Sequence, residues 1–343
     1  MFTKKFLFII IAILLLAGCS TKDKTEDKQD DETVMKNTDA SSEVFPLTGT
    51  STKEDNARRA VAVMINNHPQ ARPQSGLSEA DIVYELLAEG DITRLLAVFQ
   101  SETPDQIGPV RSARDYYIEL AKGLDCLYVC HGNSPEAKTM LDKGYIDNLN
   151  GLYYDGTLFQ RTSDRKAPHN SYTSFDSIEK GAEEKGYDMT GAPEPFTFLT
   201  EEEEKALQGE PVSKIEVIYG GSSSNVQYEY EKTEEKYTRY SDGEQTVENQ
   251  SEKPVLLDNI FIIEAAHQVV DNKGRRKIEL KSGGKGYLLQ KGKINEVDWV
   301  NKDERIIPVK NGKEVGFVTG KTWVNIIPDE PGLDKNVSFS QEN

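Results

Sequence analysis

The sequence is short of basic residues. Its 41 lysines and arginines stand against 58 aspartates and glutamates, and the formal net charge is -17 at pH 7. A chain of this charge is repelled by nucleic acids and by anionic lipid headgroups. We therefore expect no nucleic-acid partner, and no membrane contact through a basic face.

The sequence also lacks an apolar run long enough to span a bilayer. Its longest run, Phe6 to Ala17, follows Lys4 and Lys5 and is shorter than the ~20 residues that a spanning helix needs. It has the length of a signal-peptide core, and two small residues, Ala17 and Gly18, stand directly before Cys19. The pattern predicts a lipoprotein with signal peptide 1–18, cut before Cys19 and lipidated there, for example with palmitate. An ordinary secretory signal and a retained membrane span are the alternatives.

A lipid on Cys19 would attach the mature chain to the cell membrane on its extracytoplasmic side. Cysteine is otherwise scarce, since only Cys126 and Cys130 remain. They lie four residues apart in an apolar stretch that predicts a buried strand, which would separate their Cα atoms by ~13 Å. A disulfide needs less than ~7 Å. We expect two free, buried thiols.

Composition divides the chain into segments. Residues after Cys19 are polar and charged with few apolar groups, which predicts a disordered stalk. Strands alternating with helices follow, and then short strands separated by turn signals such as Asp242-Gly243 and Asn311-Gly312. The fold class is therefore an α/β or α+β N-terminal domain followed by a mostly β C-terminal domain. The predicted boundaries are signal peptide 1–18, stalk 19–57, α/β domain 58–190, linker 191–212, β domain 213–330 and tail 331–343.

Arginines gather in the predicted loops of the first domain although the whole chain is acidic. Guanidinium groups suit phosphate and carboxylate ligands, and helix starts favour anions. His131 directly follows a predicted strand, where α/β domains place their sites. The hypothesis is an anion-binding cleft formed by Arg94, Arg111, Ser112, Arg114, His131, Ser134, Arg161 and His169. The alternative is that the arginines neutralise nearby acids such as Glu85, Asp91 and Asp115.

The sequence offers little for catalysis. Ser134, His131 and Asp115 could be chosen as a triad, but no serine lies in a nucleophile elbow. A metal site could be chosen from His68, Asp81, His131 and His169, but their spacing matches no known zinc pattern, so no metal site and no cofactor are predicted. We expect a binding protein rather than an enzyme.

Long strings of the sequence resemble the YerB lipoprotein family of Firmicutes. In the first domain they are 63–77, 91–94, 107–114, 131–135 and 168–172, and in the second 271–276, 282–286 and 320–323. The resemblance covers nearly the whole mature chain. It implies two domains and no known reaction. We expect histidine in relatives where this chain has Cys130, which would leave His131 without an adjacent partner here.

A shorter likeness concerns the segment Pro109 to Asp115, which is similar in outline to LytR-CpsA-Psr phosphotransferases. Those enzymes bind lipid-linked pyrophosphate with arginines and a metal-holding aspartate, but a fold-level analogy is only associational. The leading hypothesis is an envelope lipoprotein that binds an anionic, wall-associated or phosphate-bearing ligand. The alternatives are a phosphoryl or glycosyl-phosphate transferase or hydrolase that would use Asp91 or Asp115, and a scaffold for another envelope protein.

Overall fold

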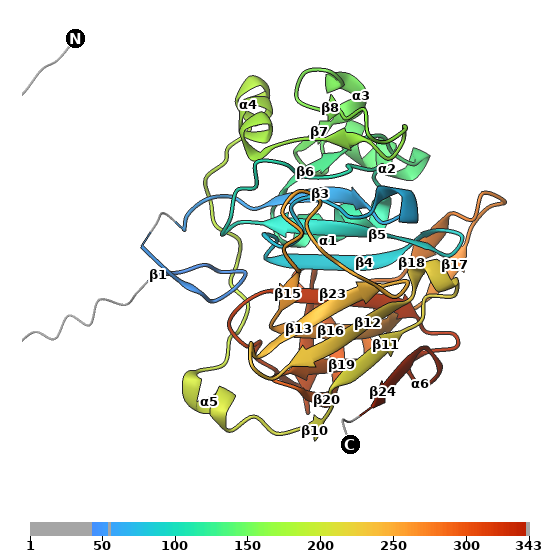
Figure 1. Cartoon of the computed structure of the whole chain (residues 1–343). Coiled ribbons are helices and arrows are strands. Elements are labelled where there is room, and N and C mark those ends of the chain that lie inside the picture. Colours follow the sequence, from blue (N-terminus) through green and yellow to red (C-terminus); the bar gives the residue numbers. More distant parts are fainter. Residues whose placement is uncertain (1–42, 54–55, 341–343) are drawn as a thin grey trace, which may run out of the picture. The chain divides into compact units, whose positions relative to one another are not determined.

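One sheet of 12 strands runs through both halves of the sequence in the computed structural model, which describes residues 43–53 and 56–340 (Figure 1). From edge to edge its strands are β22 (Lys313–Glu314), β21 (Arg305–Lys310), β20 (Lys293–Lys302), β19 (Gly284–Gln290), β16 (Asn259–Ala265), β23 (Thr322–Pro328), β4 (Ile82–Glu89), β5 (Ile92–Phe99), β3 (Val61–Asn66), β6 (Leu127–Cys130) and β7 (Asn148–Asn150), with β10 (Glu210–Pro211) paired to β20. The halves join where β23 pairs in parallel with β4.

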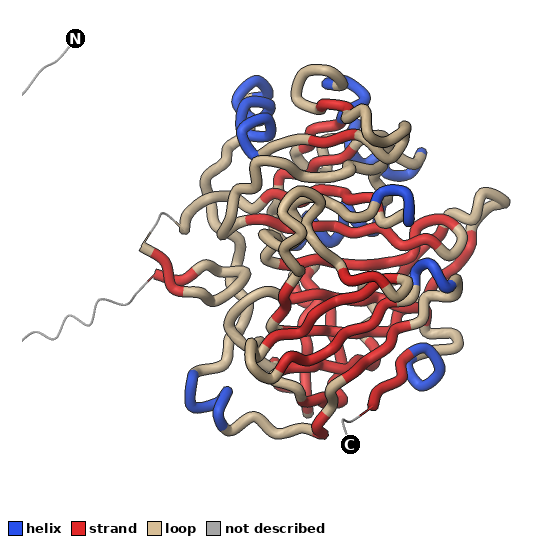
Figure 2. Tube along the Cα trace, viewed as in Figure 1, coloured by secondary structure: helices blue, strands red, loops and turns tan. Residues whose placement is uncertain are grey.

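A second sheet of six strands packs on one face of the large sheet. It contains β14 (Glu244–Gln245), β13 (Lys236–Ser241), β12 (Val226–Glu231), β11 (Lys214–Val217), β24 (Val337–Ser340) and β15 (Leu256–Leu257). Three two-stranded ribbons complete the strands: β1 (Glu43–Val44) with β2 (Ser51–Thr52), β8 (Gln160–Arg161) with β9 (Ser171–Tyr172), and β17 (His267–Val269) with β18 (Arg276–Ile278). Figure 2 shows the strands filling the interior, with the helices at the periphery.

The helices are short and mostly belong to the first half. They are α1 (Asp115–Gly123), α2 (Pro135–Asp142), α3 (Gly151–Tyr154), α4 (Phe175–Lys185), α5 (Glu201–Lys205) and α6 (Leu333–Asn336), with 3-10 turns at Pro69–Ala71 and Ser222–Ser224. Serine side chains cap two of them: Ser134 caps α2 and Ser174 caps α4, and Gly186 ends α4 with φ +68°. Among the described residues, no helix is long and apolar enough to cross a membrane.

Side-chain alternation along the strands builds two cores, one on each face of the large sheet. On β3, Val61, Val63 and Ile65 enter the core that also contains the six-stranded sheet. Ala62 and Met64 enter the opposite core, which α1 and α2 cover. The predicted mixed first half and β-rich second half are confirmed. Cys126 and Cys130 are free and buried, as predicted.

The structure differs in three places from the predicted segments. The two halves share one sheet instead of forming separate bodies, because the β4 edge is completed by β23 from the far end of the chain. The predicted stalk, 19–57, includes the β1–β2 ribbon, whose Leu47 is buried. The predicted linker and tail contain α5 and β24, and β24 pairs with β11. The predicted signal peptide and Cys19 lie outside the described residues.

Candidate functional site

The candidate site lies where β3 and β6 end. These strands are parallel neighbours, so the segments that follow them leave the sheet at the same edge. Arg111 lies across that edge: its amide donates to Met64 O of β3 at 2.8 Å, and its carbonyl accepts from the His131 amide, after β6, at 2.9 Å. His68 follows β3 in the same way. The backbone thus brings Arg111 to the loops that carry three of the four histidines.

The Arg111 side chain is half-buried and carries no acidic partner. Among the described residues, no group accepts a hydrogen bond from its guanidinium, and its Nε is buried without a partner. Burial and the nearby positive charge of Arg94 lower the pKa of Arg111 to about 10. The group is still a cation at neutral pH, so a half-buried positive charge is left without a counterion.

Two histidine rings stack beside Arg111. The centroids of His68 and His169 lie 4.7 Å apart. The Gln70 amide donates to His68 Nδ1 at 3.2 Å, and Asn66 Nδ2 lies 2.9 Å from His169 Nδ1. Asn66 Oδ1 accepts from the His68 amide, so its NH₂ faces His169 and Nδ1 of that ring is an acceptor.

It follows that both rings, when neutral, carry their hydrogen on Nε2. Burial lowers the pKa of His68 and of His169, and nearby positive charge, including that of Arg111, lowers both further. The two imidazoles are therefore neutral at pH 7, and each has one N–H to donate. Neither Nε2 has a protein hydrogen-bond partner among the described residues, which leaves two donors beside an unpaired guanidinium.

His131 and Arg161 form a hydrogen-bonded pair near Arg111, whose positive charge contributes to lowering the pKa of His131. Arg161 Nη2 donates to His131 Nε2 at 3.2 Å, so the ring hydrogen is on Nδ1, which donates to Ser171 Oγ at 2.7 Å. Burial and then Arg161 lower the pKa of His131, while Asp155 opposes them. Asp155 pairs with Arg161 at 2.8 Å. We call Arg111, His68, His131, Arg161 and His169 the Arg111 site.

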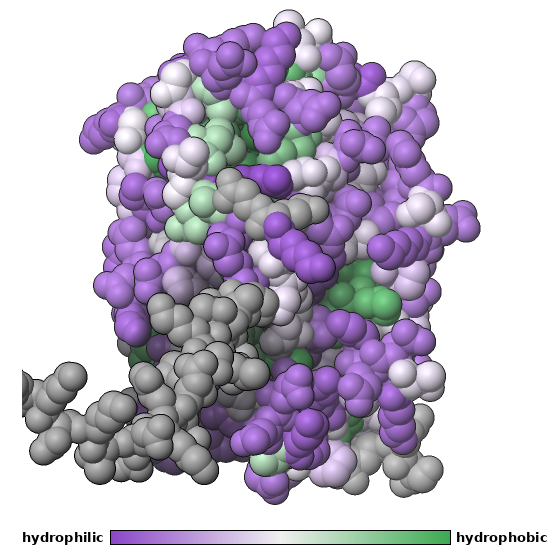
Figure 3. All heavy atoms as spheres, turned by 90° about the vertical axis from the view of Figure 1, so that its left-hand side faces the viewer, coloured by the Kyte–Doolittle hydropathy of each residue, from purple (hydrophilic) through white to green (hydrophobic). Residues whose placement is uncertain are grey.

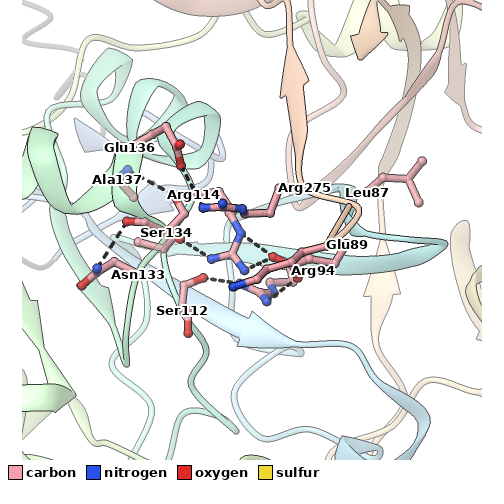
Figure 4. Close-up of polar contacts among 12 residues, drawn as sticks. Leu87, Glu89, Arg94, Ser112, Arg114, Asn133, Ser134, Glu136, Ala137 and Arg275 are labelled. Atoms are coloured by element: carbon pink, nitrogen blue, oxygen red, sulfur yellow. Dashed lines mark hydrogen bonds and ion pairs between the residues drawn. The ribbon is translucent and has the colours of Figure 1, made fainter. Parts of the chain in front are cut away.

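Two further arginines of the predicted cleft are engaged elsewhere. Arg94 and Arg114 both pair with Glu89 at the end of β4 (Figure 4). The Arg94 guanidinium lies 2.7 Å from Glu89 and also donates to the Ser112 carbonyl, while Arg114 Nε donates to Glu89 at 2.6 Å. Both guanidiniums are almost fully buried, and their donors are engaged by the Glu89 carboxylate and by the carbonyls of Ser112 and Ala113, so they are not available to a ligand.

The comparisons with known proteins agree with this architecture. Residues 47–188 match the family model described as "Protein of unknown function (DUF3048) N-terminal domain", and residues 215–324 match the DUF3048 C-terminal domain. The chain belongs to the DUF3048 family. It is 48% identical over 324 residues to YerB of Bacillus subtilis (strain 168), which is named as a lipoprotein, and the match covers 94% of each sequence.

A solved DUF3048 structure has the same fold. The crystal structure of YerB protein from Bacillus subtilis superposes with a TM-score of 0.81 at 50% sequence identity, covering 87% of this chain and 99% of that one. The resemblance to the YerB family that the sequence motifs indicate is thereby confirmed. This DUF3048 chain is a homologue of a protein named as a lipoprotein, which is consistent with an envelope location.

The two serines of the predicted cleft have structural roles in this DUF3048 fold. Ser112 donates to the His131 carbonyl at 3.1 Å, and Ser134 accepts from the Ala137 amide as the cap of α2. Arg275, from the second half, approaches the same region and lies 3.5 Å from Glu136. Figure 4 shows the guanidiniums of Arg94, Arg114 and Arg275 grouped with the carboxylates of Glu89 and Glu136, and the two serines beside them.

The aspartates of the enzyme alternative do not lie in the Arg111 site. Asp91 is exposed in the turn between β4 and β5, 4.0 Å from Arg276. Asp115 is the first residue of α1, and burial raises its pKa. Among residues 43–53 and 56–340, no group of three His, Cys, Asp or Glu side chains is placed to hold a metal ion.

Two residues that decide the site are absent from the predicted cleft. His68 is predicted there only as a possible metal ligand, although this histidine follows a strand end just as His131 does. Glu89, which pairs with Arg94 and Arg114, has no predicted role. The signal for His68 was available in its position. The role of Glu89 was not, because the distance between charged side chains across β4, β5 and α1 depends on strand register.

Proposed function

We propose that this chain is an envelope lipoprotein that binds a phosphate- or carboxylate-bearing ligand at the Arg111 site. One observation carries the proposal: Arg111 is a half-buried cation whose guanidinium has no acceptor among the described residues. An uncompensated charge in such a place costs free energy unless an anion arrives. The donors on His68 and His169 add directional hydrogen bonds, and a guanidinium can hold two oxygens of one ligand group.

Arg161 adds positive charge to the Arg111 site, but its guanidinium already has partners. It pairs with Asp155 and donates to His131, so it attracts an anion electrostatically and is not the main hydrogen-bond donor to the ligand. The remaining arginines of the predicted cleft, Arg94 and Arg114, are buried and both pair with Glu89. Binding should therefore depend on Arg111 far more than on Arg114.

A scaffold role has less support. It would require a broad apolar patch. The exposed large apolar side chains are Val44, Leu152, Tyr153, Val269, Val270 and Phe339. They occur singly or in adjacent pairs on different elements, and the face in Figure 3 is mostly hydrophilic with small separate apolar areas. No observation favours the transferase or hydrolase alternative.

The binding proposal is tested by thermal unfolding with inorganic phosphate and pyrophosphate. An anion at ~100 times its dissociation constant should stabilise the folded chain by about 2.7 kcal/mol. Arg111→Ala should abolish this effect. Lys277→Ala, which removes one positive charge from an exposed position of β18, is the matched control and should leave the effect intact. Stabilisation that survives Arg111→Ala would contradict the proposal.

The location is tested on Cys19. We propose cleavage before this residue, lipidation of its thiol and exposure of the mature chain on the extracytoplasmic side. Labelled fatty acid should enter the wild-type chain and not Cys19→Ser, and protease added to intact cells without their wall should digest the wild-type chain. An unmodified Cys19 by mass spectrometry would contradict the lipid, and protection from the protease would contradict the sidedness.

A further inference from the structure

A groove beside the Arg111 site runs along β7, the edge strand of the large sheet. Its cavity volume is about 390 Å³, and the ends of α2 and α4 and the helix α3 enclose it. This size falls in the range of small-molecule sites, ~300–1,000 Å³. The Arg111 site alone would hold only a charged group, so the neighbouring groove bears on what that charged group is attached to.

Three tyrosine rings line the groove. Tyr153 and Tyr154 come from α3, and Tyr187 follows α4. Tyr153 is 69% exposed, which is unusual for a large aromatic side chain with no evident packing role. An aromatic ring offers an apolar face and the tyrosine hydroxyl a polar edge, the combination that suits a ligand with both C–H faces and hydroxyl groups.

Amide and carboxyl groups lie between the tyrosines. Asn148 donates to the Ile146 carbonyl at 3.2 Å, which fixes the amide through its nitrogen. Asp142, at the end of α2, is exposed at the groove. Asn150 forms a rigid wall, since its oxygen accepts from the Gly132 and Leu152 amides and its nitrogen donates to Asn133.

The same wall connects the groove to the Arg111 site. Asn150 is bonded to Gly132, the neighbour of His131. A Cβ at Gly151, the first residue of α3, would collide with the His131 ring, so the start of α3 packs directly on that histidine. At its other end α3 leads from Tyr154 into Asp155, the partner of Arg161. A ligand could therefore place its anionic group at Arg111 and extend over α3 into the groove.

We propose that this groove is a saccharide subsite, and that the ligand of the Arg111 site is a sugar carrying a phosphate or carboxylate group. The inference rests on the proposed anion-binding function. Sugar rings stack their C–H faces on tyrosines and exchange hydrogen bonds with amides and carboxylates. An extended peptide pairing with the sheet edge is disfavoured, because β7 has only 3 residues and offers a short ladder.

Calorimetry on the full-length chain in detergent tests the proposal with three probes: inorganic phosphate, glucose 1-phosphate and glucose. Glucose 1-phosphate should bind about tenfold more tightly than inorganic phosphate, and Tyr153→Ala should remove most of that advantage without changing phosphate binding. Leu152→Ala is the matched control: this residue is 58% exposed on the same helix but does not line the groove, and its loss should change neither affinity.

The outcomes separate the two proposals. If phosphate binds through Arg111 but glucose 1-phosphate binds no more tightly, the saccharide subsite is wrong and the anion site stands. If neither ligand binds in a manner that depends on Arg111, the proposed function itself fails. A second variant, Tyr187→Phe, keeps the ring and should retain the glucose 1-phosphate advantage. Equal effects of Tyr153→Ala and Leu152→Ala would overturn the subsite, as would an extended peptide competing with glucose 1-phosphate.

Discussion

Glu85 and Arg239 form a fully buried ion pair at 2.8 Å between the two halves of the chain. Glu85 is in the middle of β4, and Arg239 comes from β13 of the six-stranded sheet. The Trp323 indole on β23 donates to the same carboxylate at 3.0 Å, and its ring lies 4.4 Å from the guanidinium carbon. The interface between the halves thus contains a buried ion pair at its centre. Its residues come from β4, in the segment that matches the N-terminal family model, and from β13 and β23, in the segment that matches the C-terminal family model.

Removing one member of this pair should destabilise the fold strongly. Arg239→Met leaves the Glu85 carboxylate buried without its cation, and a loss of about 3–5 kcal/mol in the free energy of unfolding is expected. Glu85→Gln should have a similar effect. In the double variant the loss should be clearly smaller than the sum, because neither charge is then stranded. Urea unfolding measures all three values, and additive losses would mean that the pair is not coupled.

Arg111 and Arg114 should respond in opposite ways to substitution. Arg114→Ala or Glu89→Gln breaks the Glu89 group and should lower the free energy of unfolding by about 1–3 kcal/mol. Anion binding at Arg111 should persist in the folded fraction. Arg111→Ala should abolish binding with little loss of stability. Asp142→Asn is the control for the stability measurement, because it breaks the exposed Lys138–Asp142 pair and should leave the free energy of unfolding unchanged. If Arg114→Ala lost anion binding but kept normal stability, the assignment of a structural role to Arg114 and a binding role to Arg111 would be wrong.

Anion binding should strengthen as the pH falls. Burial lowers the pKa values of His68, His131 and His169 from 6.5, and Arg111 also lowers each of them. These rings are neutral in the folded chain at pH 7 and become cations on acidification. A bound anion favours the charged form, so affinity should rise by up to about tenfold for each histidine whose pKa increases by about one unit. Sulfate is the suitable ligand, because its charge does not change between about pH 8 and pH 5, where histidine titrates.

The same histidines, together with His267, whose pKa burial lowers to about 4, determine how histidine titration changes the stability without ligand. Their folded-state pKa values lie below the unfolded value, so the unfolded chain binds more protons as the pH drops. The free energy of unfolding should therefore decrease as the pH falls through 6.5 toward the lowered pKa values, and sulfate should oppose the decrease. In Arg111→Ala the pH dependence of sulfate binding should vanish. A sulfate affinity that is flat across this range in the wild-type chain would contradict the role of the histidines.

The two family segments should not fold separately. The pairing of β23 with β4 completes the large sheet, and the core on one face contains Val83 and Leu95 from the first half beside Ile260 and Trp323 from the second. A fragment of residues 43–190 would expose this apolar surface, and so would a fragment of residues 213–340. Each alone should give poorly dispersed amide NMR spectra, and co-expression should restore a stable complex. Cooperative unfolding of either isolated fragment would show that the segment is independent.

Local patterns in the sequence predicted much of the fold. Ser134 before Pro135 indicates the start of α2, and Thr173 or Ser174 that of α4, where Ser174 is the cap, because a cap needs only its own helix. The strand that ends at Cys130 was equally clear from its apolar residues, and the spacing of Cys126 and Cys130 along an extended chain excluded a disulfide. His131 was predicted directly after a strand and follows β6 in the structure, since strand ends also depend on near neighbours in the sequence.

Partners distant in sequence could be decided only by the tertiary structure. The alternative to an anion site paired Glu85 with arginines of the first domain, yet the cation of Glu85 is Arg239 from the second half. The arginines of the predicted cleft looked alike in sequence, but Glu89 reaches Arg94 and Arg114 and not Arg111. Charge pairing acts over a few ångströms, and the register of the strands and the docking of α1 set those distances. The residue types were sufficient to predict an anion site, whereas only packing determined which guanidinium is left free to form one.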